Sequence, residues 1–347
     1  MRLSIKAIFK LFLPIIAFPY MIATSIINWL YDKNILKAEK LSVPVISVGN
    51  ITAGGTGKTP FVISLSIFLQ NSGYKVGIIS RGYRRKGKDQ IIVSTGKGPL
   101  VSPHISGDEP QLIACKTKDA VIIADRDKVA AGKTAIEKYN CAILIIDDGY
   151  QHRRLSRDVN ILLWDSYSNP YKEKVLPAGK LRESLHGLKR ASLLVFTRTD
   201  TIPDNYKRFF REKRPDLKQY CSPISIEKIV IASSGNTLNL EDLKELSIFA
   251  FCGLGNPQQF FDTVNIFNSS KPITKKFHDH HKYNEKEIAS LIEDAKSNNC
   301  GYLITTEKDS INFPEGLPKI DNLLLIGISL EIEENLKKEI STIISQL

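Results

Sequence analysis

The stretch Val43–Pro60 constrains the fold of this chain more than any other part, because it reads V-P-V-I-S-V-G-N-I-T-A-G-G-T-G-K-T-P. Val43–Val48 is a short β-branched run that stops at Gly49, and Phe61–Gln70 carries helical apolar spacing. The stretch therefore predicts a strand, a glycine loop and a helix in succession. This order is typical of a loop whose backbone N–H groups surround a phosphate, so we predict a nucleotide site here.

The nucleotide contacts are expected from the loop itself. Lys58 offers a point charge to the β- and γ-phosphates, Thr59 offers a hydroxyl to Mg²⁺, and the helix that begins near Thr59 adds the positive end of its dipole. The alternative, a glycine turn without a ligand, is weaker because G-G-T-G-K-T meets several independent requirements. One departure is visible, since the usual spacing has a glycine where this chain has Thr52. The predicted nucleotide-binding residues are Thr52, Gly54, Gly55, Thr56, Gly57, Lys58 and Thr59.

Length and composition indicate a folded protein of about two domains. Lys and Arg exceed Asp and Glu by 48 − 37 = 11, which suits an anionic partner such as nucleic acid, a phosphorylated substrate or an acidic membrane surface. A general lysine bias would give the same charge. The five cysteines are scattered without C-x-x-C pairing, which is simplest to explain by a reducing cytosol.

The amino-terminal stretch Leu11–Leu30 contains no charged residue, and lysines or arginine flank it on both sides. It only just reaches the roughly 20 apolar residues of a spanning helix, and no small-residue cleavage site of a secretory signal follows it. Two readings remain, an anchor in the cytoplasmic leaflet and an apolar helix packed on the soluble domain. We favour the anchor because the stretch lacks a clear polar face, and we predict a membrane-associating helix over residues 1–40.

The region 41–220 has the pattern of a parallel sheet with crossover helices. Ala120–Ala124 and Ala142–Ile146 are continuous apolar runs with a helical segment between them. The second run ends in Asp147 and Asp148, which we predict to bind Mg²⁺ together with the Thr59 hydroxyl; a plain Asp-Asp-Gly turn is the alternative. Arg81 follows another strand in a basic loop and is predicted to bind phosphate or substrate at the same edge of the sheet.

Beyond a predicted linker at 221–240, a second and smaller α/β unit is predicted over 241–347. It contains Phe277–His281, where one histidine poised by Asp279 is better supported than a structural zinc site. Asn284 and Glu287 predict a capping box for the helix that follows. In the first unit, Asp108 reads either as a helix cap or as a proton acceptor, and the local sequence does not decide between these.

Seven motifs follow one another along the chain in this order: G-G-T-G-K-T-P, S-R-G-Y, G-D-E-P, D-D-G-Y-Q-H, L-P-A-G-x-L-R-E, F-x-D-H-H and T-x-K-D. Together they resemble the tetraacyldisaccharide 4′-kinase family of lipid A biosynthesis. The resemblance extends from about Val43 to Asp309. It implies an ATP- and Mg²⁺-dependent kinase that phosphorylates the 4′-hydroxyl of a tetraacyl glucosamine disaccharide 1-phosphate. It also implies two α/β/α domains joined by a two-stranded linker, with the active site between them.

The resemblance also assigns residues. Asp108 and His280 are implied to form a dyad that activates the acceptor hydroxyl, with Lys58 and Asp279 beside them, although which of the two takes the proton stays open. Matching motif positions make Gln151, Arg182, Glu183 and Arg81 the candidates for substrate binding.

The fold class that we expect is a P-loop kinase-like parallel sheet with helices on both faces, a smaller α/β domain and an N-terminal apolar helix. The expected location is the cytoplasmic face of the inner membrane, with the lipid disaccharide and the cytoplasmic leaflet as partners. We expect no nucleic acid and no obligate protein partner. Two rivals are a membrane-associated P-loop GTPase or ATPase switch, in which Thr197–Asp200 reads the base, and a membrane-associated nucleic-acid binder.

Overall fold

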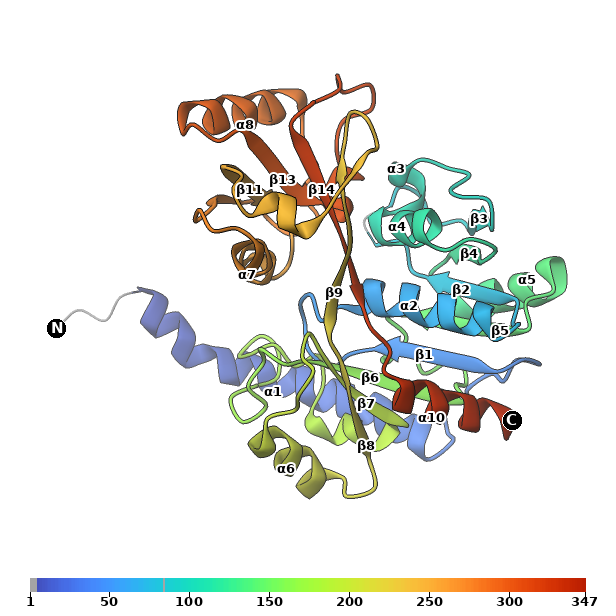
Figure 1. Cartoon of the computed structure of the whole chain (residues 1–347). Coiled ribbons are helices and arrows are strands. Elements are labelled where there is room, and N and C mark those ends of the chain that lie inside the picture. The colour runs from blue at the N-terminus through green and yellow to red at the C-terminus, as the bar shows by residue number, and fades with distance from the viewer. Residues whose placement is uncertain (1–4, 84) are drawn as a thin grey trace.

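The computed structural model describes residues 5–83 and 85–347, which form two α/β units (Figure 1). In each unit helices alternate with the strands of one sheet. The α-helices are α1 (Ile5–Asp32), α2 (Lys58–Asn71), α3 (Pro103–Ser106), α4 (Asp108–Lys116), α5 (Lys128–Tyr139), α6 (Asp204–Lys213), α7 (Pro257–Phe267), α8 (Glu285–Ser297), α9 (Glu307–Ser310) and α10 (Glu334–Ser345). The 3-10 helices are η1 (Leu185–Arg190) and η2 (Leu240–Leu243).

The first sheet has eight strands, and all of its pairings are parallel except that of the edge strand β3. Its central strands are buried along their whole length, as the continuous apolar runs predict. Across the sheet the strands are β3 (Ile91–Thr95), β4 (Val121–Ala124), β2 (Val76–Ser80), β5 (Ile143–Asp147), β1 (Val45–Gly49), β6 (Val159–Asp165), β7 (Leu193–Thr197) and β8 (Lys218–Ser222).

Helices cover both faces of this sheet because successive strand residues point in opposite directions. Ile46 and Val48 of β1 pack with α2, α4 and α10, whereas Val45 packs with α5. Helix α6 covers the β6 and β7 part of the α5 face through Phe209 and Phe210. The predicted parallel sheet with helices on both faces is confirmed. Its loops at the carboxyl ends of β1, β2 and β5 carry the candidate site residues.

The second sheet has six strands with α7 on one face and α8 on the other. The predicted capping box of α8 is confirmed, since Asn284 accepts from the Glu287 N–H while Glu287 accepts from the Asn284 N–H, each at 3.0 Å. Across the sheet the strands are β10 (Thr237–Leu238), β9 (Ile224–Ile231), β14 (Leu323–Leu330), β13 (Tyr302–Thr306), β11 (Ile248–Cys252) and β12 (Ile273–Lys276).

Strands β9 and β14 join the two units (Figure 1). They pair antiparallel from Ile231 opposite Leu324 to Ile224 opposite Leu330, and Leu330 packs into the core of the first unit. After β14 the chain returns to the first sheet as α10, whose Leu336 is fully buried there. The units therefore differ from the predicted division. The predicted linker 221–240 contains the long strand β9, and the predicted range 241–347 includes a helix of the first unit.

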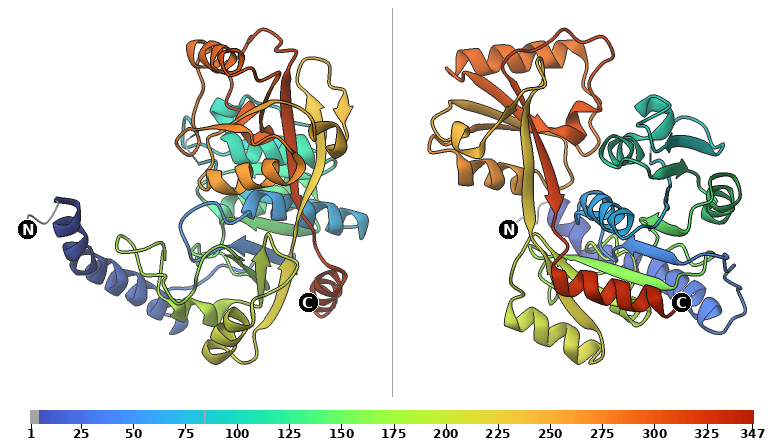
Figure 2. Two further views of the ribbon diagram at one scale, coloured as in Figure 1. Left: turned by 60° about the vertical axis from the view of Figure 1, so that its left-hand side comes forward. Right: turned by 45° about the vertical axis from the view of Figure 1, so that its right-hand side comes forward.

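Helix α1 lies along the first unit and extends beyond it at its amino-terminal end (Figure 2). It forms despite Pro14 and Pro19. Within residues 5–83 and 85–347, no helix combines the length and the apolar character that crossing a membrane requires. Residues 1–4 of the predicted segment 1–40 lie outside the described residues.

Candidate active site

The phosphate loop connects β1 to α2 and is shaped by two glycines. Gly54 has φ 113° and Gly57, the N-cap of α2, has φ 79°, which are left-handed conformations that suit glycine. A Cβ atom on Gly57 would lie 2.6 Å from the Leu330 side chain. Asn50 donates to the Thr56 hydroxyl at 2.9 Å and accepts from the Lys58 ammonium at 3.3 Å. The predicted strand, loop and helix are thus present, with Lys58 at the helix start.

The two carboxylates at the carboxyl end of β5, Asp147 and Asp148, differ in charge state. Burial and the nearby Glu109 raise the pKa of Asp147 to about 7, although the Ser80 hydroxyl donates to it at 2.9 Å. For Asp148 burial acts in the same direction, but Lys58 and Arg182 outweigh it and lower the pKa to about 2. Arg182 donates to both Asp148 oxygens at 3.1 and 2.9 Å, and the Lys58 ammonium lies 3.7 Å away. In this state Asp148 compensates the charge of Lys58.

A divalent cation fits this corner chemically. In the described part of the chain, no group of three or more His, Cys, Asp or Glu side chains could hold a metal by itself. Mg²⁺, however, is usually held by one or two carboxylates together with substrate phosphates. The buried Asp147 carboxylate, raised in pKa by burial and by negative neighbours, favours an added positive charge. Thr59, Asp147 and Asp148 line one cavity, so the predicted ligand set is compatible with Mg²⁺.

The metal-free protein is expected to lose stability as the pH rises toward 7. The pKa of Asp147 is 3.8 in an unfolded chain, and burial raises it to about 7 in the folded protein. Between these values the folded state binds more protons, so the free energy of unfolding falls with pH. Asp147→Asn should remove this slope and be more stable than wild type at pH 8 by a few kcal/mol at most, since one pKa unit corresponds to about 1.4 kcal/mol.

Urea unfolding in the presence of a chelator at pH 5 and pH 8 measures this effect. Asp148→Asn is the matched control with the opposite sign. The lowered pKa of Asp148 stabilises the fold at both pH values and is lost only in strong acid, so this variant should be less stable than wild type at both. An unchanged slope in Asp147→Asn would contradict the assignment.

The second unit contributes His280, whose Nδ1 lies 2.5 Å from the Asp108 carboxylate at the start of α4. The Nε2 atom of His280 lies 3.7 Å from Asp279. His280 has φ 57°, a left-handed conformation that is uncommon outside glycine and concentrates at functional sites. Its backbone N–H donates to Gly253, whose own N–H donates to the buried Asp309. These hydrogen bonds therefore hold the turn that carries His280 in place.

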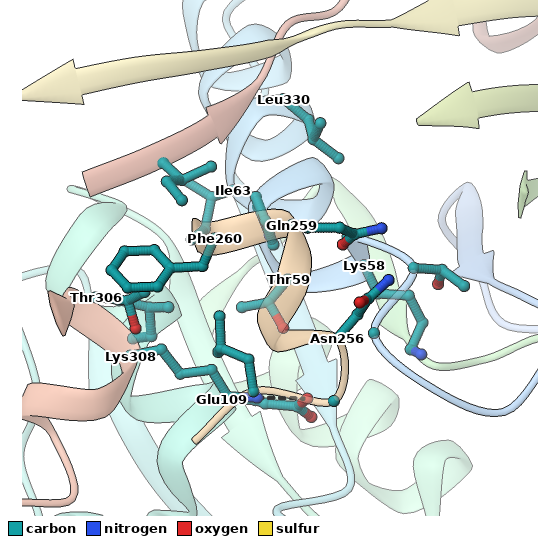
Figure 3. A pocket seen from close by; sticks show the side chains of 18 of the residues that line it. Lys58, Thr59, Ile63, Glu109, Asn256, Gln259, Phe260, Thr306, Lys308 and Leu330 are labelled. Atoms are coloured by element: carbon teal, nitrogen blue, oxygen red, sulfur yellow. Dashed lines mark ion pairs between the residues drawn. The ribbon is translucent and has the colours of Figure 1, made fainter. Parts of the chain in front are cut away.

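Asp108 is kept ionised by its neighbours. Burial opposes the charge, but the hydrogen bond to His280 and the positive charge of Lys308 lower the pKa of Asp108 below its ordinary value. Burial opposes the charge of Lys308 as well, and Glu109, Asp108 and Asp279 more than offset this by raising its pKa. Figure 3 shows Lys308 and Glu109 facing each other, with 4.0 Å between ammonium and carboxylate. Positive and negative side chains of the two units therefore face one another, with Lys308 of the second unit beside Asp108 and Glu109 of the first.

One cavity of about 460 Å³ lies between the two units. In Figure 3, Lys58 and Thr59 face it from the first unit, and Asn256, Gln259 and Phe260 face it from the N-cap and first turn of α7. The predicted site residues that line it are Gly54, Gly55, Thr56, Gly57, Lys58, Thr59, Arg81, Asp147, Asp148, Arg182, Asp279 and His280. The cavity thus brings the phosphate loop and the histidine turn together, as the predicted site requires.

Four predicted site residues lie outside the lining of this cavity: Thr52, Asp108, Gln151 and Glu183. Thr52 is buried in an antiparallel bridge with Leu181. Asp108 lies directly behind His280. Glu183 and Gln151 bond to each other, and Gln151 also donates to the Asn50 carbonyl; their role in substrate binding stays a prediction.

Three further residues belong to the site; the sequence offered Glu109 as an alternative to Asp108, and it did not single out Lys308 or Lys128. Lys308 and Glu109 line the cavity beside predicted residues, and their membership of T-x-K-D and G-D-E-P was the available signal. Lys128 is buried and donates to the backbone carbonyls of Asp147 and Asp148 at 2.5 and 3.1 Å. Its signal was its place just after the apolar run that forms β4, at the edge of the sheet where ligands bind.

The segment Thr197–Asp200, considered above for reading the nucleotide base, makes structural contacts. The Thr197 hydroxyl donates to the Thr56 carbonyl of the phosphate loop at 3.0 Å. The Arg198 guanidinium pairs with Asp165 at 3.1 Å, and Asp165 also accepts from Gln259 of α7. The segment therefore supports the loop and links the two units.

A parallel sheet with a glycine loop at the start of α2, facing carboxylates and a histidine across a shared cavity, defines a P-loop phosphotransferase. Residues 9–345 match the family model described as Tetraacyldisaccharide-1-P 4′-kinase. This chain belongs to the tetraacyldisaccharide 4′-kinase family, and it is an ATP-dependent kinase. The P-loop switch is not favoured.

The chain is similar to named members of that family over nearly its whole length. It is 35% identical to the tetraacyldisaccharide 4′-kinase of Syntrophus aciditrophicus, with 95% of this chain and 90% of the relative covered. It is 37% identical to the enzyme of Aquifex aeolicus over 90% and 91%. The crystal structure of LpxK from Aquifex aeolicus in complex with ATP superimposes with a TM-score of 0.72 and 34% identity, covering 95% of this chain and 97% of that chain.

Proposed function

We propose that this protein transfers the γ-phosphate of ATP to the 4′-hydroxyl of a tetraacyl glucosamine disaccharide 1-phosphate, with His280 as the base. The observation that carries the proposal is the single cavity lined by both Lys58 and His280. A phosphate loop on one wall and a base on the other are what an in-line transfer to an alcohol needs, because positioning and charge neutralisation supply most of the catalysis.

Lys58, Thr59 and the loop N–H groups hold the triphosphate in this proposal. Mg²⁺ would be held by Thr59, Asp147 and Asp148, and it supplies charge neutralisation on the phosphates. Arg182, which binds Asp148, would help to neutralise the negative charge of the γ-phosphate. Arg81 lines the same cavity from the loop after β2 and suits the 1-phosphate or another anionic group of the acceptor.

His280 accepts the proton of the sugar hydroxyl through Nε2, the nitrogen that does not contact Asp108. The sugar oxygen forms a bond to the γ-phosphorus as the bond from phosphorus to the β,γ-bridging oxygen breaks, and ADP leaves. Asp108 accepts from Nδ1–H, which orients the ring and stabilises the imidazolium. Asp108 is 6% exposed and lies behind the ring, so a direct proton transfer from the sugar to Asp108 is less well supported.

Incubation of the purified protein with labelled ATP and the disaccharide lipid in detergent micelles tests this proposal. Label should move into a more acidic lipid, and ATP should be preferred to GTP. GTP-selective binding without transfer to the lipid would indicate the switch instead. Salt-sensitive binding to DNA or RNA that Lys58→Ala leaves unchanged would indicate a nucleic-acid binder.

We also propose that α1 holds the protein at the cytoplasmic face of the inner membrane. Phe18, Ile22 and Ile26 repeat at four-residue intervals and are 58%, 41% and 52% exposed, and Trp29 lies on the same side of the helix. An exposed apolar stripe of this kind suits the boundary between headgroups and acyl chains. The net charge of +11 suits an anionic leaflet.

Co-sedimentation with vesicles that contain phosphatidylglycerol measures this association. Phe18→Glu combined with Ile22→Glu should lower the bound fraction at least about tenfold, because each buried side chain of this size contributes about 1.5–3 kcal/mol. Ile266→Glu, at a 75% exposed position on α7, is the matched control and should bind as wild type does. Equal binding of all three proteins would contradict the anchor.

A further inference from the structure

We propose that Glu183 is a positioning residue that ties helix α1 to the phosphate loop, so that Asn28 of α1 contributes to nucleotide binding from outside the cavity. The inference rests on the binding of ATP at the phosphate loop and does not require the proposed lipid acceptor. It gives Glu183 a role other than the contact with substrate that its motif suggested.

Glu183 is saturated by protein donors. Its side chain is 4% exposed. One Arg190 nitrogen donates to both of its oxygens at 2.7 and 2.8 Å, and the Gln151 amide donates to it at 3.0 Å. A Cβ atom at Gly187 would lie 2.8 Å from the carboxylate, which shows how closely the backbone surrounds it. A buried carboxylate with this many donors is a scaffold element, because its charge is already compensated.

The contacts continue from Glu183 to the phosphate loop. The Gln151 amide that donates to Glu183 also donates to the carbonyl of Asn50 at 2.8 Å. Asn50 in turn holds Thr56 and Lys58 through its side chain. The residues just before Glu183 pair with the loop as well, since Arg182 N–H donates to the Ile51 carbonyl at 2.7 Å. Movement of Glu183 would therefore move the first half of the loop.

The contacts also continue from Glu183 to α1. The Asn28 amide donates to Glu183 at 3.0 Å, and the Tyr20 hydroxyl donates to the Arg182 carbonyl at 2.8 Å. Arg153 donates to the Asn28 carbonyl at 2.8 Å and pairs with Asp32 at 2.7 Å. Tyr20 and Asn28 are eight residues, about two helical turns, apart on α1. One face of α1 is thus built into the support of the nucleotide site.

The test measures nucleotide binding without lipid. The dissociation constant of a non-hydrolysable ATP analogue with Mg²⁺ is determined for the full chain in detergent micelles, and KM for the lipid is measured separately. Asn28→Ala should weaken nucleotide binding about three- to fivefold, the effect of one hydrogen bond. Glu183→Gln, which loses charge-assisted bonds, should weaken it about tenfold or more. KM for the lipid should change less than twofold (about the error of such assays).

Thr24→Ala is the matched control, one helical turn before Asn28, because the Thr24 hydroxyl bonds to the backbone of its own helix. It should bind nucleotide as wild type does. In the double variant Asn28→Ala with Glu183→Gln, the affinity should equal that of Glu183→Gln alone, since both act through one chain of contacts.

Three results would overturn the proposal. An unchanged nucleotide affinity in both variants would leave α1 uncoupled from the loop. A raised KM for the lipid with normal nucleotide binding would make Glu183 a substrate contact. A lower melting temperature with normal nucleotide affinity would make the contacts merely structural. Asn28 lies at the edge of the fold, so its variant decides the matter even where Glu183→Gln fails to fold.

Discussion

Lys58→Ala is expected to lower kcat/KM for phosphate transfer by about 10³-fold or more, the scale of removing one principal charge that stabilises a phosphoryl transition state. The Lys58 ammonium is the point charge at the start of α2, and its side chain is 11% exposed against the cavity. Asn50 and Asp148 hold it in place before nucleotide arrives. Since positioning and charge neutralisation dominate this chemistry, its loss should cost more than that of the base.

Steady-state kinetics with varied ATP and fixed lipid measure this loss. Lys86→Ala is the matched control, because it removes the same charge from the exposed basic loop after β2, and it should retain wild-type kinetics. The free energy of unfolding of Lys58→Ala should stay near that of wild type, since Asp148 keeps Arg182 as a partner. Near-normal turnover of Lys58→Ala would contradict the assignment of the loop.

The first unit could largely be predicted from the sequence because its strands are buried on both faces. A strand such as β5 reads as an unbroken apolar run, and the loop Gly54–Thr59 has requirements that few other structures impose. The way in which β9, β14 and α10 connect the two units could not be predicted in the same way. β14 reads as one more apolar run, and nothing local shows that it pairs with β9 or that α10 returns to the first sheet.

The site was predictable only in part for a related reason. Asp108 and His280 are 172 residues apart, and no periodicity connects positions at that separation, so their pairing was implied only by the family resemblance. Lys308 and Lys128 could not be distinguished from surface lysines, because the carboxylates around Lys308 and the backbone carbonyls that Lys128 binds come together only in the fold. For Glu183, a motif position indicated importance, whereas its buried contacts indicate support of the loop.

Asp108→Asn is expected to lower kcat by about 10²–10⁴-fold, the usual contribution of a positioned acid–base group. Asparagine keeps the shape of the side chain but removes the charge that orients the His280 ring and compensates the imidazolium. The affinity for the ATP analogue should stay within about twofold, because Asp108 lies outside the cavity lining. Kinetics of transfer and binding of the analogue, measured on the same preparations, separate the two effects.

The double variant Asp108→Asn with His280→Ala decides whether the pair acts as one unit. If His280 takes the proton and Asp108 works through it, the double variant should be no slower than His280→Ala alone, because groups that act together are strongly non-additive. Asp279→Asn is the comparison, since its carboxylate lies 3.7 Å from Nε2 and is 43% exposed, and a smaller loss is expected. Multiplicative losses for Asp108 and His280 would show two independent roles, and Asp108 would then require a contact of its own with the reacting hydroxyl.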